Sequence, residues 1–515
     1  MKKILIANRG EIAVRIGRAC REMGISPVAV YSECDRNAVH VRQADQAYAI
    51  GGRAPRDSYL RIDRLLEAAR KSGADAVHPG YGFLAEHAGF ARAVVDAGLV
   101  FIGPTPEVIA LMGSKTAARA AAQRAGVPVV PGTVEPVPSG ITGSELDELA
   151  RSIGYPMIVK AVSGGGGKGM RTVTDPEELP GAIRAARSEA DTAFGDAAVY
   201  LERRLTRPRH IEVQILGDQH GTVLPLVERE CSIQRRHQKV VEETPSMAVT
   251  PALRRSLTAA AASVARAVDY TNAGTIEFLV DEDGRFFFLE MNTRLQVEHP
   301  ITELVTGIDL VQWQIRIARG ERLDLEPEAL LSPRGHAIEC RIYAEDPDNQ
   351  FLPSPGRILA LQTPAGPGIR NDGAVTAGMD VSIDYDPLLS KLVAWAEDRP
   401  RAIARMRRAL DEYVVAGIRT TVPFFAWLLD QPEFADGRFH TTTLDDILQS
   451  RNGRPFAEPT SEEVDVAVIA AALQATMAPA GAFEVGGAPA VPASRWMAQA
   501  RLEGVEGLPA RALRD

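Results

Sequence analysis

The sequence has few cysteines and no long apolar run. Its four cysteines are widely separated and form no Cys-x-x-Cys pair, which predicts neither a disulfide framework nor a zinc site: Cys20, Cys34, Cys231 and Cys340. The apolar runs are far shorter than the roughly 20 residues of a membrane-spanning helix. The apolar stretch after the first lysines is too short for a signal peptide. We therefore expect a cytoplasmic protein with no membrane partner.

Lysine is scarce as well. Only eight of the 58 basic residues are Lys, and the other 50 are Arg. A chain that uses Arg wherever charge alone is wanted retains Lys where a compact ammonium is required, as beside a phosphate. The alternative is that these lysines were retained by chance. The net charge of −9 argues against general nucleic-acid binding, so we expect no nucleic-acid partner.

What the sequence does contain, from its start, is a β-α-β pattern. Residues 3–8 predict a strand and residues 10–23 an amphipathic helix, and the alternation continues to about residue 110. This predicts a parallel α/β domain over 1–110. Its first turn lacks Gly-x-Gly-x-x-Gly, which argues against NAD. At 515 residues the chain is long enough for three or so domains.

A glycine-rich segment separates two further predicted strands. One strand ends at Lys160, four successive glycines run from Gly164 to Gly167, Lys168 follows, and a β-like run resumes at Met170. This is not a P-loop, because a P-loop enters a helix. Backbone N–H groups of such a loop, with a lysine beside them, suit a mobile cover over phosphate oxygens. The alternative is a plain flexible turn.

Two apolar runs around Asp283-Gly284 predict a β-hairpin. If these two residues form the turn, Glu282 faces Arg285 and Glu277 faces Glu290. Directly opposed residues have Cβ atoms only about 4.5–5.5 Å apart. Two carboxylates at that distance require a cation or a shared proton. The alternative is a pair of solvated acids on an exposed face.

Polar residues continue at every second position after this hairpin. Asn292, Arg294, Gln296 and Glu298 share a face with Glu290 if the chain stays extended. Hard oxygen ligands without a His/Cys cluster favour magnesium over zinc. This face therefore predicts a site for a metal and a small anion.

The most cationic segment, "VERECSIQRRHQKVVEETP", contains His237 and Lys239 and predicts an anion site; a solvated loop is the alternative. Further on, residues 301–319 predict one helix, and the region from about 335 is rich in short strands and turns. Beyond about residue 447 the composition shifts towards an Ala/Pro/Gly linker.

Together these segments resemble the biotin carboxylases of the ATP-grasp superfamily. The resemblance runs from Met1 to about residue 447 and rests on seven segments in order: "IANRGEIAVRI", "HPGYGFLAE", "GGGGKGMR", "ERECSIQRRHQKVVEE", "EMNTRLQVEHP", "HAIECRIYAEDP" and "FLPSPG". It implies an α/β and α+β multidomain fold. An ATP-grasp domain over 111–330, with a mobile lid over about 132–203, follows the N-terminal domain and precedes a strand-rich C-terminal domain over 331–447.

The resemblance also implies an activity, the ATP-dependent carboxylation of biotin by bicarbonate through carboxyphosphate. This is the first half-reaction of an acyl-CoA or pyruvate carboxylase. Carried over position by position, the residues expected to bind nucleotide and substrates are Lys115, Lys160, Gly164, Gly165, Gly166, Gly167, Lys168, Glu202, Leu205, His210, Gln234, His237, Gln296 and Val297.

The same resemblance assigns the metal and the chemistry. It implies that Mg²⁺, or Mn²⁺ in its place, is held by Glu277, Glu290 and Asn292. It implies that Lys239 and Arg294 bind bicarbonate. The remaining two roles are a general base on bicarbonate and a group that stabilises the biotin enolate, and they fall to Glu298 and Arg341.

The sequence departs from the family pattern near the expected nucleotide. Ser163 stands where a fifth glycine is common, and "RRL" follows Glu202 where many relatives have Lys and an aromatic residue. These departures leave the contacts on the adenine side open.

Residues 448–515 fall outside the resemblance. They lack the Ala-Met-Lys-Met signature of a biotin carrier, and the final lysine of the sequence is Lys391. We therefore expect a biotin carboxyl carrier on another chain, a carboxyltransferase partner and a homo-oligomer. The tail is then a docking extension or a truncated linking segment.

Two other functions remain at this stage. One is an ATP-grasp ligase that activates a different acid, and the other is a catalytically silent subunit kept as a scaffold. The sequence does not fix the acyl-CoA or oxo-acid that is finally carboxylated, because a partner transferase makes that choice.

Overall fold

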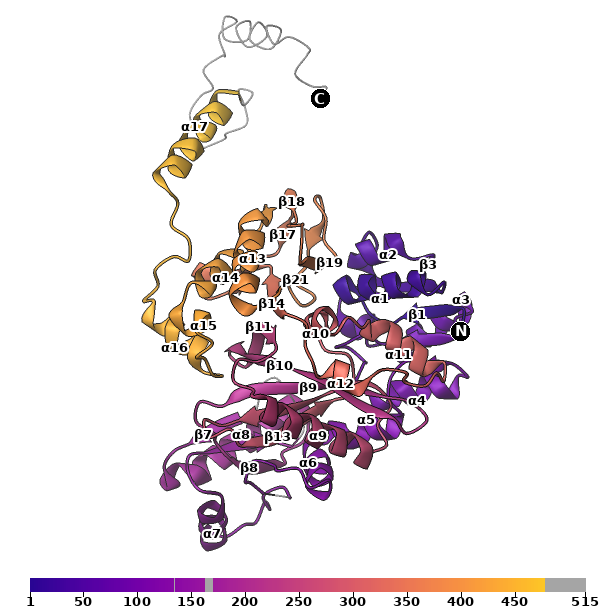
Figure 1. The fold of residues 1–515 in the computed structure, drawn as a ribbon, viewed down its shortest axis with the longest axis vertical. Coiled ribbons are helices and arrows are strands. Elements are labelled where there is room, and N and C mark those ends of the chain that lie inside the picture. The colour runs from indigo at the N-terminus through magenta and orange to yellow at the C-terminus, as the bar shows by residue number, and fades with distance from the viewer. Residues whose placement is uncertain (134, 163–169, 478–515) are drawn as a thin grey trace, which may run out of the picture. The chain divides into compact units, whose positions relative to one another are not determined.

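The computed structural model describes residues 1–133, 135–162 and 170–477 (Figure 1). The expected loop from Gly164 to Lys168 therefore lies outside the described residues. The chain divides into two compact units, Met1–Phe456 and the segment from Ala457 onwards. Each unit is described by itself.

The first unit begins with a five-stranded parallel sheet in the order β3-β2-β1-β4-β5. Its strands are β1 (Lys3–Ile6), β2 (Ser26–Ser32), β3 (Gln46–Gly51), β4 (Ala76–His78) and β5 (Val100–Phe101), and the intervening helices are α1 (Gly10–Glu22), α2 (Val39–Gln43), α3 (Ile62–Ser72) and α4 (Ala88–Asp96). Buried aliphatic residues on both faces of the strands, such as Leu5 and Val28, explain why helices cover both sides. The predicted parallel α/β arrangement is confirmed.

The largest sheet has eight antiparallel strands in the order β13-β12-β9-β10-β11-β14-β21-β19. They are β9 (Arg209–Gly217), β10 (Val223–Arg235), β11 (Gln238–Thr244), β12 (Asn272–Val280), β13 (Phe286–Asn292), β14 (His336–Tyr343), β19 (Ile369–Gly373) and β21 (Leu388–Ala396). Because β11 pairs with β14, the strand-rich C-terminal region continues the central sheet.

The alternation along β9 divides this sheet into an apolar and a polar face. Ile211, Val213 and Ile215 belong to a core closed by the helices α5 (Pro106–Gly113), α6 (Lys115–Arg124) and α9 (Pro251–Ala267). Residues on the opposite face of the same strand are polar and buried, as period 2 requires. The polar face is where the site lies.

The predicted hairpin forms, but its turn differs from the expected one. The NH of Asp281 donates to the carbonyl of Arg285 at 2.9 Å, so Glu282 and Arg285 are not paired across the turn. The register changes between Glu277 and its neighbour because Leu289 is an extra residue in β13, a β-bulge. The bulge restores the expected opposition of Glu277 and Glu290.

A smaller antiparallel sheet, β7-β6-β8, has a core of its own. It consists of β6 (Met157–Ala161), β7 (Met170–Val173) and β8 (Val199–Arg203), covered by α7 (Gly143–Ile153) and α8 (Leu179–Phe194). All residues of this hydrophobic cluster lie between Val137 and Leu201. The two strands predicted on either side of the glycine segment are therefore present as β6 and β7.

The helix predicted over 301–319 is wrong. The structure has α10 (His299–Thr306) and α11 (Leu310–Ala318), separated by Gly307 in the left-handed region at φ 77°. A left-handed glycine is a common way to end a helix, because the following residue cannot continue it. The break places Glu298 at the N-terminus of α10.

The remaining elements complete the C-terminal part of the unit. The short strands are β15 (Glu345–Asp346), β16 (Leu352–Pro353), β17 (Gly356–Arg357), β18 (Ala360–Gln362), β20 (Asp380–Val381) and β22 (Val414–Ala416). The helices are α12 (Pro327–Leu330), α13 (Arg399–Glu412), α14 (Val422–Leu429), α15 (Pro432–Ala435) and α16 (Thr443–Ser450). Figure 1 shows these orange and yellow elements around β14 and β21.

A buried charge network joins three parts of this unit. The side chain of Glu303 in α10 accepts from Arg15 of α1 at 2.9 Å and from Arg370 of β19 at 2.7 Å. Arg370 also pairs with Asp372 at 2.7 Å. These contacts hold the N-terminal helix, the C-terminal strands and the segment around Glu298 in one arrangement.

Beyond Phe456 the structure describes one further helix, α17 (Ser461–Met477), which contains the segment predicted to be helical. Several of its aliphatic side chains are exposed, among them Val464, Val466, Val468, Ile469 and Leu473. Among the described residues, no helix combines the length and the apolar character that crossing a membrane requires.

We predict that residues 451–456 stabilise the first unit. The ring of Phe456 lies 5.5 Å from that of Phe424 and 5.2 Å from that of Trp427, and Arg451 covers its other side at 3.4 Å. Emptying this site should lower the free energy of unfolding by roughly 3 kcal/mol. Urea unfolding of F456A should show this loss, whereas V466A, at an exposed position of α17, should be neutral. Equal stability of the two variants would contradict the prediction.

Candidate active site

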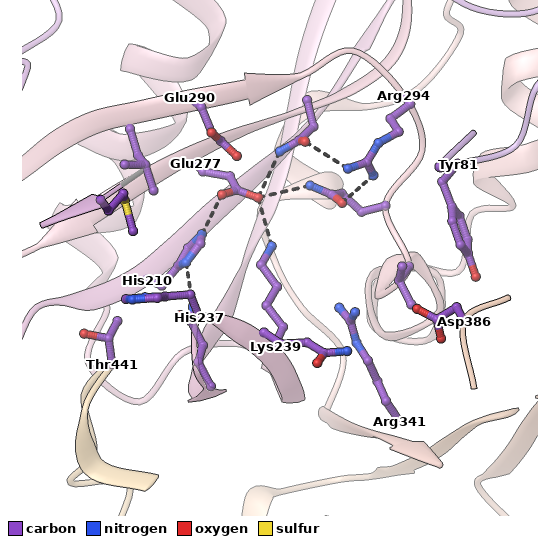
Figure 2. Close-up of a pocket in the computed structure, with 18 of the residues that line it drawn as sticks. Tyr81, His210, His237, Lys239, Glu277, Glu290, Arg294, Arg341, Asp386 and Thr441 are labelled. Atoms are coloured by element: carbon purple, nitrogen blue, oxygen red, sulfur yellow. Dashed lines mark hydrogen bonds and ion pairs between the residues drawn. The ribbon is translucent and has the colours of Figure 1, made fainter. Parts of the chain in front are cut away.

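A cavity of about 1230 Å³ opens on the polar face of the eight-stranded sheet. Its lining comes from four parts of the chain: Arg9 and Tyr81 from the N-terminal region, Tyr200 from the small sheet, His210 from the central sheet and Tyr385 from the C-terminal region. Figure 2 shows side chains from these separate elements pointing into one space.

The structure brings the predicted site residues together. All those that it describes line this cavity except Glu298, namely Lys115, Lys160, Glu202, Leu205, His210, Gln234, His237, Lys239, Glu277, Glu290, Asn292, Arg294, Gln296, Val297 and Arg341. Glu298 is fully buried directly behind the wall. Gly164, Gly165, Gly166, Gly167 and Lys168 lie outside the described residues.

The ammonium of Lys239 lies at the centre of the site among three buried carboxylates. Its Nζ is 2.6 Å from Glu212, 2.9 Å from Glu277 and 2.7 Å from Glu298. Lys239 reaches them from β11, and two of the carboxylates, Glu212 and Glu277, face each other across the β9–β12 pairing. Figure 2 shows the contact with Glu277.

The acids decide the charge states in this cluster. Burial alone would lower the pKa of Lys239, but Glu212, Glu277 and Glu298 together raise that pKa well above its usual range. Burial raises the pKa of Glu298, yet Lys239, Arg341 and Arg229 outweigh it and bring the pKa well below the usual value. Glu298 is therefore a carboxylate, held by cations on both oxygens.

The segment after β13 does not stay extended, so the predicted shared face of alternate residues is wrong. The chain turns after Asn292 and enters α10 at Glu298. The same side chains still gather, because Arg294 donates to Asn292 at 3.0 Å and to Gln296 at 2.8 Å. Asn292 and Gln296 in turn donate to Glu277 at 3.0 and 3.1 Å.

Glu290 differs from its opposed partner. Glu277 has several hydrogen-bond partners, whereas the Glu290 carboxylate points into the cavity and bonds to no side chain among residues 1–133, 135–162 and 170–477. Burial first, and the Glu277 charge second, raise the pKa of Glu290. A divalent cation beside the pair would relieve both effects, and oxygen donors are what Mg²⁺ prefers. Glu277, Glu290 and Asn292 therefore fit a magnesium ion.

On the other side of the cavity, two cations share one acid. Glu202 in β8 accepts from Lys160 at 2.6 Å and from Arg119 of α6 at 3.1 Å. Burial lowers the pKa of Lys115, which begins α6. Its ammonium faces Glu290 across the cavity wall, so this side offers compact positive charge to an anionic ligand.

The turn between β10 and β11 carries His237 in a strained conformation. Arg236 and His237 both have positive φ, 49° and 66°, and Arg235 pairs with Gln238 across them. Both central positions of such a tight turn favour glycine or asparagine. Retention of Arg and His in this backbone is typical of a site where the side chains are required.

Arg341 lies at the far end of the site on β14. Its guanidinium contacts Glu242 and lies 3.0 Å from the second oxygen of Glu298. Burial raises the pKa of Glu242 to about 7, although Arg341 acts against it. Arg341 thus presents a fixed positive charge at the cavity wall with acids behind it.

The sequence reasoning missed Glu212 and Arg229. Arg229 is fully buried and contacts Glu212, and it donates to Gln214 at 2.9 Å and to Thr275 and Thr302 at 3.0 Å. A signal for Glu212 was present, because polar residues at alternate positions 210, 212 and 214 of an apolar strand share one face. Arg229 had no such signal, since its partners come from three distant segments.

We predict that replacing Lys239 destabilises the protein through the acids left behind. The K239M variant should lose roughly 3–5 kcal/mol at pH 7, because buried carboxylates remain without their shared cation. Since Lys239 lowers the folded-state pKa of Glu298, the lost stability is present above about pH 4.3 and disappears as the pH falls. Urea unfolding at pH 7 and at pH 4 measures both values.

The matched control is K71M. Lys71 is exposed and pairs with Glu67 on α3 at 2.7 Å, so this variant should change stability little at either pH. A K239M variant that resembles K71M at pH 7 would show that the three carboxylates do not depend on the ammonium.

Three family descriptions match the sequence. They are "Biotin carboxylase, N-terminal domain" over residues 1–109, "Carbamoyl-phosphate synthase L chain, ATP binding domain" over 114–326 and "Biotin carboxylase C-terminal domain" over 339–446. The fold and the site thus define an ATP-grasp enzyme.

Relatives and solved structures agree. The chain is 52% identical over 447 residues to the biotin carboxylase of Nostoc sp., covering 86% of this chain and 99% of that protein. It is equally identical over 447 residues to one of the subunits of the pyruvate carboxylase of Methanothermobacter thermautotrophicus, covering 86% of this chain and 89% of that protein.

Among solved structures, the chain resembles the biotin carboxylase domain dimer of Hydrogenobacter thermophilus 2-oxoglutarate carboxylase in complex with MgADP, ADP and bicarbonate. The TM-score is 0.84 at 45% identity, over 89% of this chain and 99% of that one. This chain belongs to the biotin carboxylases. It catalyses the ATP-dependent carboxylation of biotin, with bicarbonate and magnesium.

Proposed function

We propose that this chain carboxylates biotin on a separate carrier chain, through carboxyphosphate, and hands the carboxylated carrier to a carboxyltransferase partner. The observation that carries the site assignment is the Lys239 cluster beside the opposed carboxylates Glu277 and Glu290. Two relatives are named as subunits, one of the pyruvate carboxylase of Methanothermobacter thermautotrophicus and one of the methylcrotonoyl-CoA carboxylase of Mus musculus, which supports partners in trans.

The nucleotide has a clear place beside the compact cations. Lys115, Lys160 and His210 would contact its phosphates, and Glu277 and Glu290, with Asn292, would hold the magnesium. When bound, magnesium neutralises phosphate charge and favours attack on the γ-phosphoryl group. Glu202 and Leu205 would lie near adenine, Gln234 and His237 towards the phosphates.

Bicarbonate would bind where Lys239, Arg294, Gln296 and the Val297 backbone converge. A bicarbonate oxygen that takes over the Lys239 ammonium weakens the ion pair that depresses the pKa of Glu298. Glu298 then becomes basic enough to accept the bicarbonate proton. The bicarbonate oxygen attacks the γ-phosphorus of ATP, which gives carboxyphosphate and ADP.

Arg341 would stabilise the enolate oxygen of biotin in the second step. Its guanidinium remains protonated at any working pH, and its forked donors suit an oxyanion. The adjacent Tyr81 and Asp386 line the same end of the cavity, as Figure 2 shows.

The region over 132–203 would act as a lid. Its hydrophobic cluster between Val137 and Leu201 is separate from the core under the eight-stranded sheet, so the region can rotate without breaking either. We further propose a homo-oligomer, since the Hydrogenobacter domain is described as a dimer. Helix α17 is our candidate docking segment because its aliphatic side chains are exposed.

The proposed division of labour predicts different losses in two variants. E298Q should abolish bicarbonate-dependent ATP cleavage, because bicarbonate is no longer deprotonated. R341A should retain part of that cleavage but lose carboxybiotin formation more severely, by about 100-fold. ADP release and carboxybiotin are measured side by side. Equal loss of both activities in both variants would refute the assignment.

The metal assignment predicts a change in magnesium dependence. E290Q should raise the magnesium concentration for half-maximal ATP cleavage about tenfold or more and lower the maximal rate, because one oxygen donor loses its charge. E282Q is the matched control, since Glu282 is exposed on the same hairpin. Magnesium titrations that superimpose for the two variants would count against Glu290.

A further inference from the structure

Lys391 is a buried lysine that the proposed mechanism does not use. It lies in β21, is fully buried and is one of only eight lysines in the chain. Burial of a lysine is rare unless its ammonium is paired and hydrogen-bonded. The choice of Lys where the chain otherwise uses Arg indicates that a compact ammonium is required at this position.

Its contacts lead directly to the active site. The ammonium donates to the backbone carbonyl of Val297 at 3.0 Å and lies 3.0 Å from the carboxylate of Glu11 on α1. It also lies 5.7 Å from the ring centre of Tyr81. Val297 and Tyr81 both line the cavity, so Lys391 supports two parts of the wall from behind.

The Val297 carbonyl belongs to the peptide bond that precedes Glu298. Directly opposite Lys391 in the β14–β21 pairing is Arg341, and residues in such a pair project from the same face of a sheet. Arg341 contacts the Glu298 carboxylate at 3.0 Å. One strand pair therefore supplies two cations, one for the side chain of Glu298 and one for its backbone.

We propose that Lys391 is a positioning residue, which fixes the Val297–Glu298 peptide and thereby holds the Glu298 carboxylate at the bicarbonate site. The inference rests on the function proposed for Glu298. Lys391 touches neither substrate nor reacting atoms, and it acts through the backbone of the base.

A plain structural role is the competing explanation. In that case Lys391 only balances the buried charge of Glu11, whose pKa burial raises to about 7. The two explanations differ in what happens when both charges are removed together. Charge balance is then restored, whereas the donor to the Val297 carbonyl is still missing.

The test compares K391M with the double variant E11Q/K391M. K391M should lower both the thermal midpoint and kcat for bicarbonate-dependent ATP cleavage, the latter about tenfold or more, with the KM for ATP within twofold of the original. E11Q/K391M should recover the thermal midpoint but keep the low kcat. Recovery of kcat together with stability would overturn the proposal.

R399M is the matched control. Arg399 is buried in the same region, pairs with Glu243 at 2.8 Å and donates to the carbonyls of Phe434 and Ala435 at 2.7 Å, away from the cavity. It should lower the thermal midpoint without the tenfold loss of kcat. If R399M lowers kcat as K391M does, general destabilisation explains both variants and the proposal fails.

Hydrogen exchange separates this proposal from the function on which it rests. In K391M and in E11Q/K391M, amide exchange of the peptide that contains residues 297–302 should accelerate at least threefold, with β12 unchanged. If the original chain shows no ATP cleavage, the role of Glu298 fails, and exchange still decides whether Lys391 holds the peptide. Unchanged exchange at 297–302 would refute the positioning role.

Discussion

The site depends on one constraint: three carboxylates buried on one face of a sheet require a cation, and Lys239 supplies it. Glu212, Glu277 and Glu298 each lie within 3 Å of its ammonium. Isolated buried charges are too costly to retain, so the acids and the lysine persist only together. This mutual dependence keeps the acids ionised and leaves a cation that an incoming anion can share.

The continuous eight-stranded sheet explains how distant residues reach this point. His210, Lys239 and Glu277 project from neighbouring strands, and Arg341 and Lys391 project from the part of the sheet that the C-terminal region adds. Backbone pairing fixes these strands, so the donors and acids are aligned before any ligand binds. Such alignment is what makes a charged site effective in low-dielectric surroundings.

Much of this arrangement could be predicted from the sequence. The opposition of Glu277 and Glu290 follows from a hairpin pattern, although the turn expected at Asp283-Gly284 has a different register. The opposition survives only because Leu289 forms a bulge, and a bulge leaves no sequence signal of its own. The gathering of Asn292, Arg294 and Gln296 was expected from strand alternation but arises from a turn.

Other residues could not be predicted because their roles depend on tertiary contacts. Arg229 meets partners from three segments, and Lys391 meets Glu11 some 380 residues earlier in the sequence. In sequence, Lys391 is only a lysine within an apolar stretch. The structure gives it an acid, a carbonyl and a neighbouring arginine on the same face of the sheet.

The central claim is that the Lys239 cluster activates bicarbonate for transfer to biotin. The most direct measurement supplies the purified chain with Mg-ATP, free biotin and isotopically labelled bicarbonate, and follows ADP and labelled carboxybiotin together. We predict that carboxybiotin accumulates with ADP and that both stop when bicarbonate is stripped out. ADP release that continues at the same rate without bicarbonate would contradict the account.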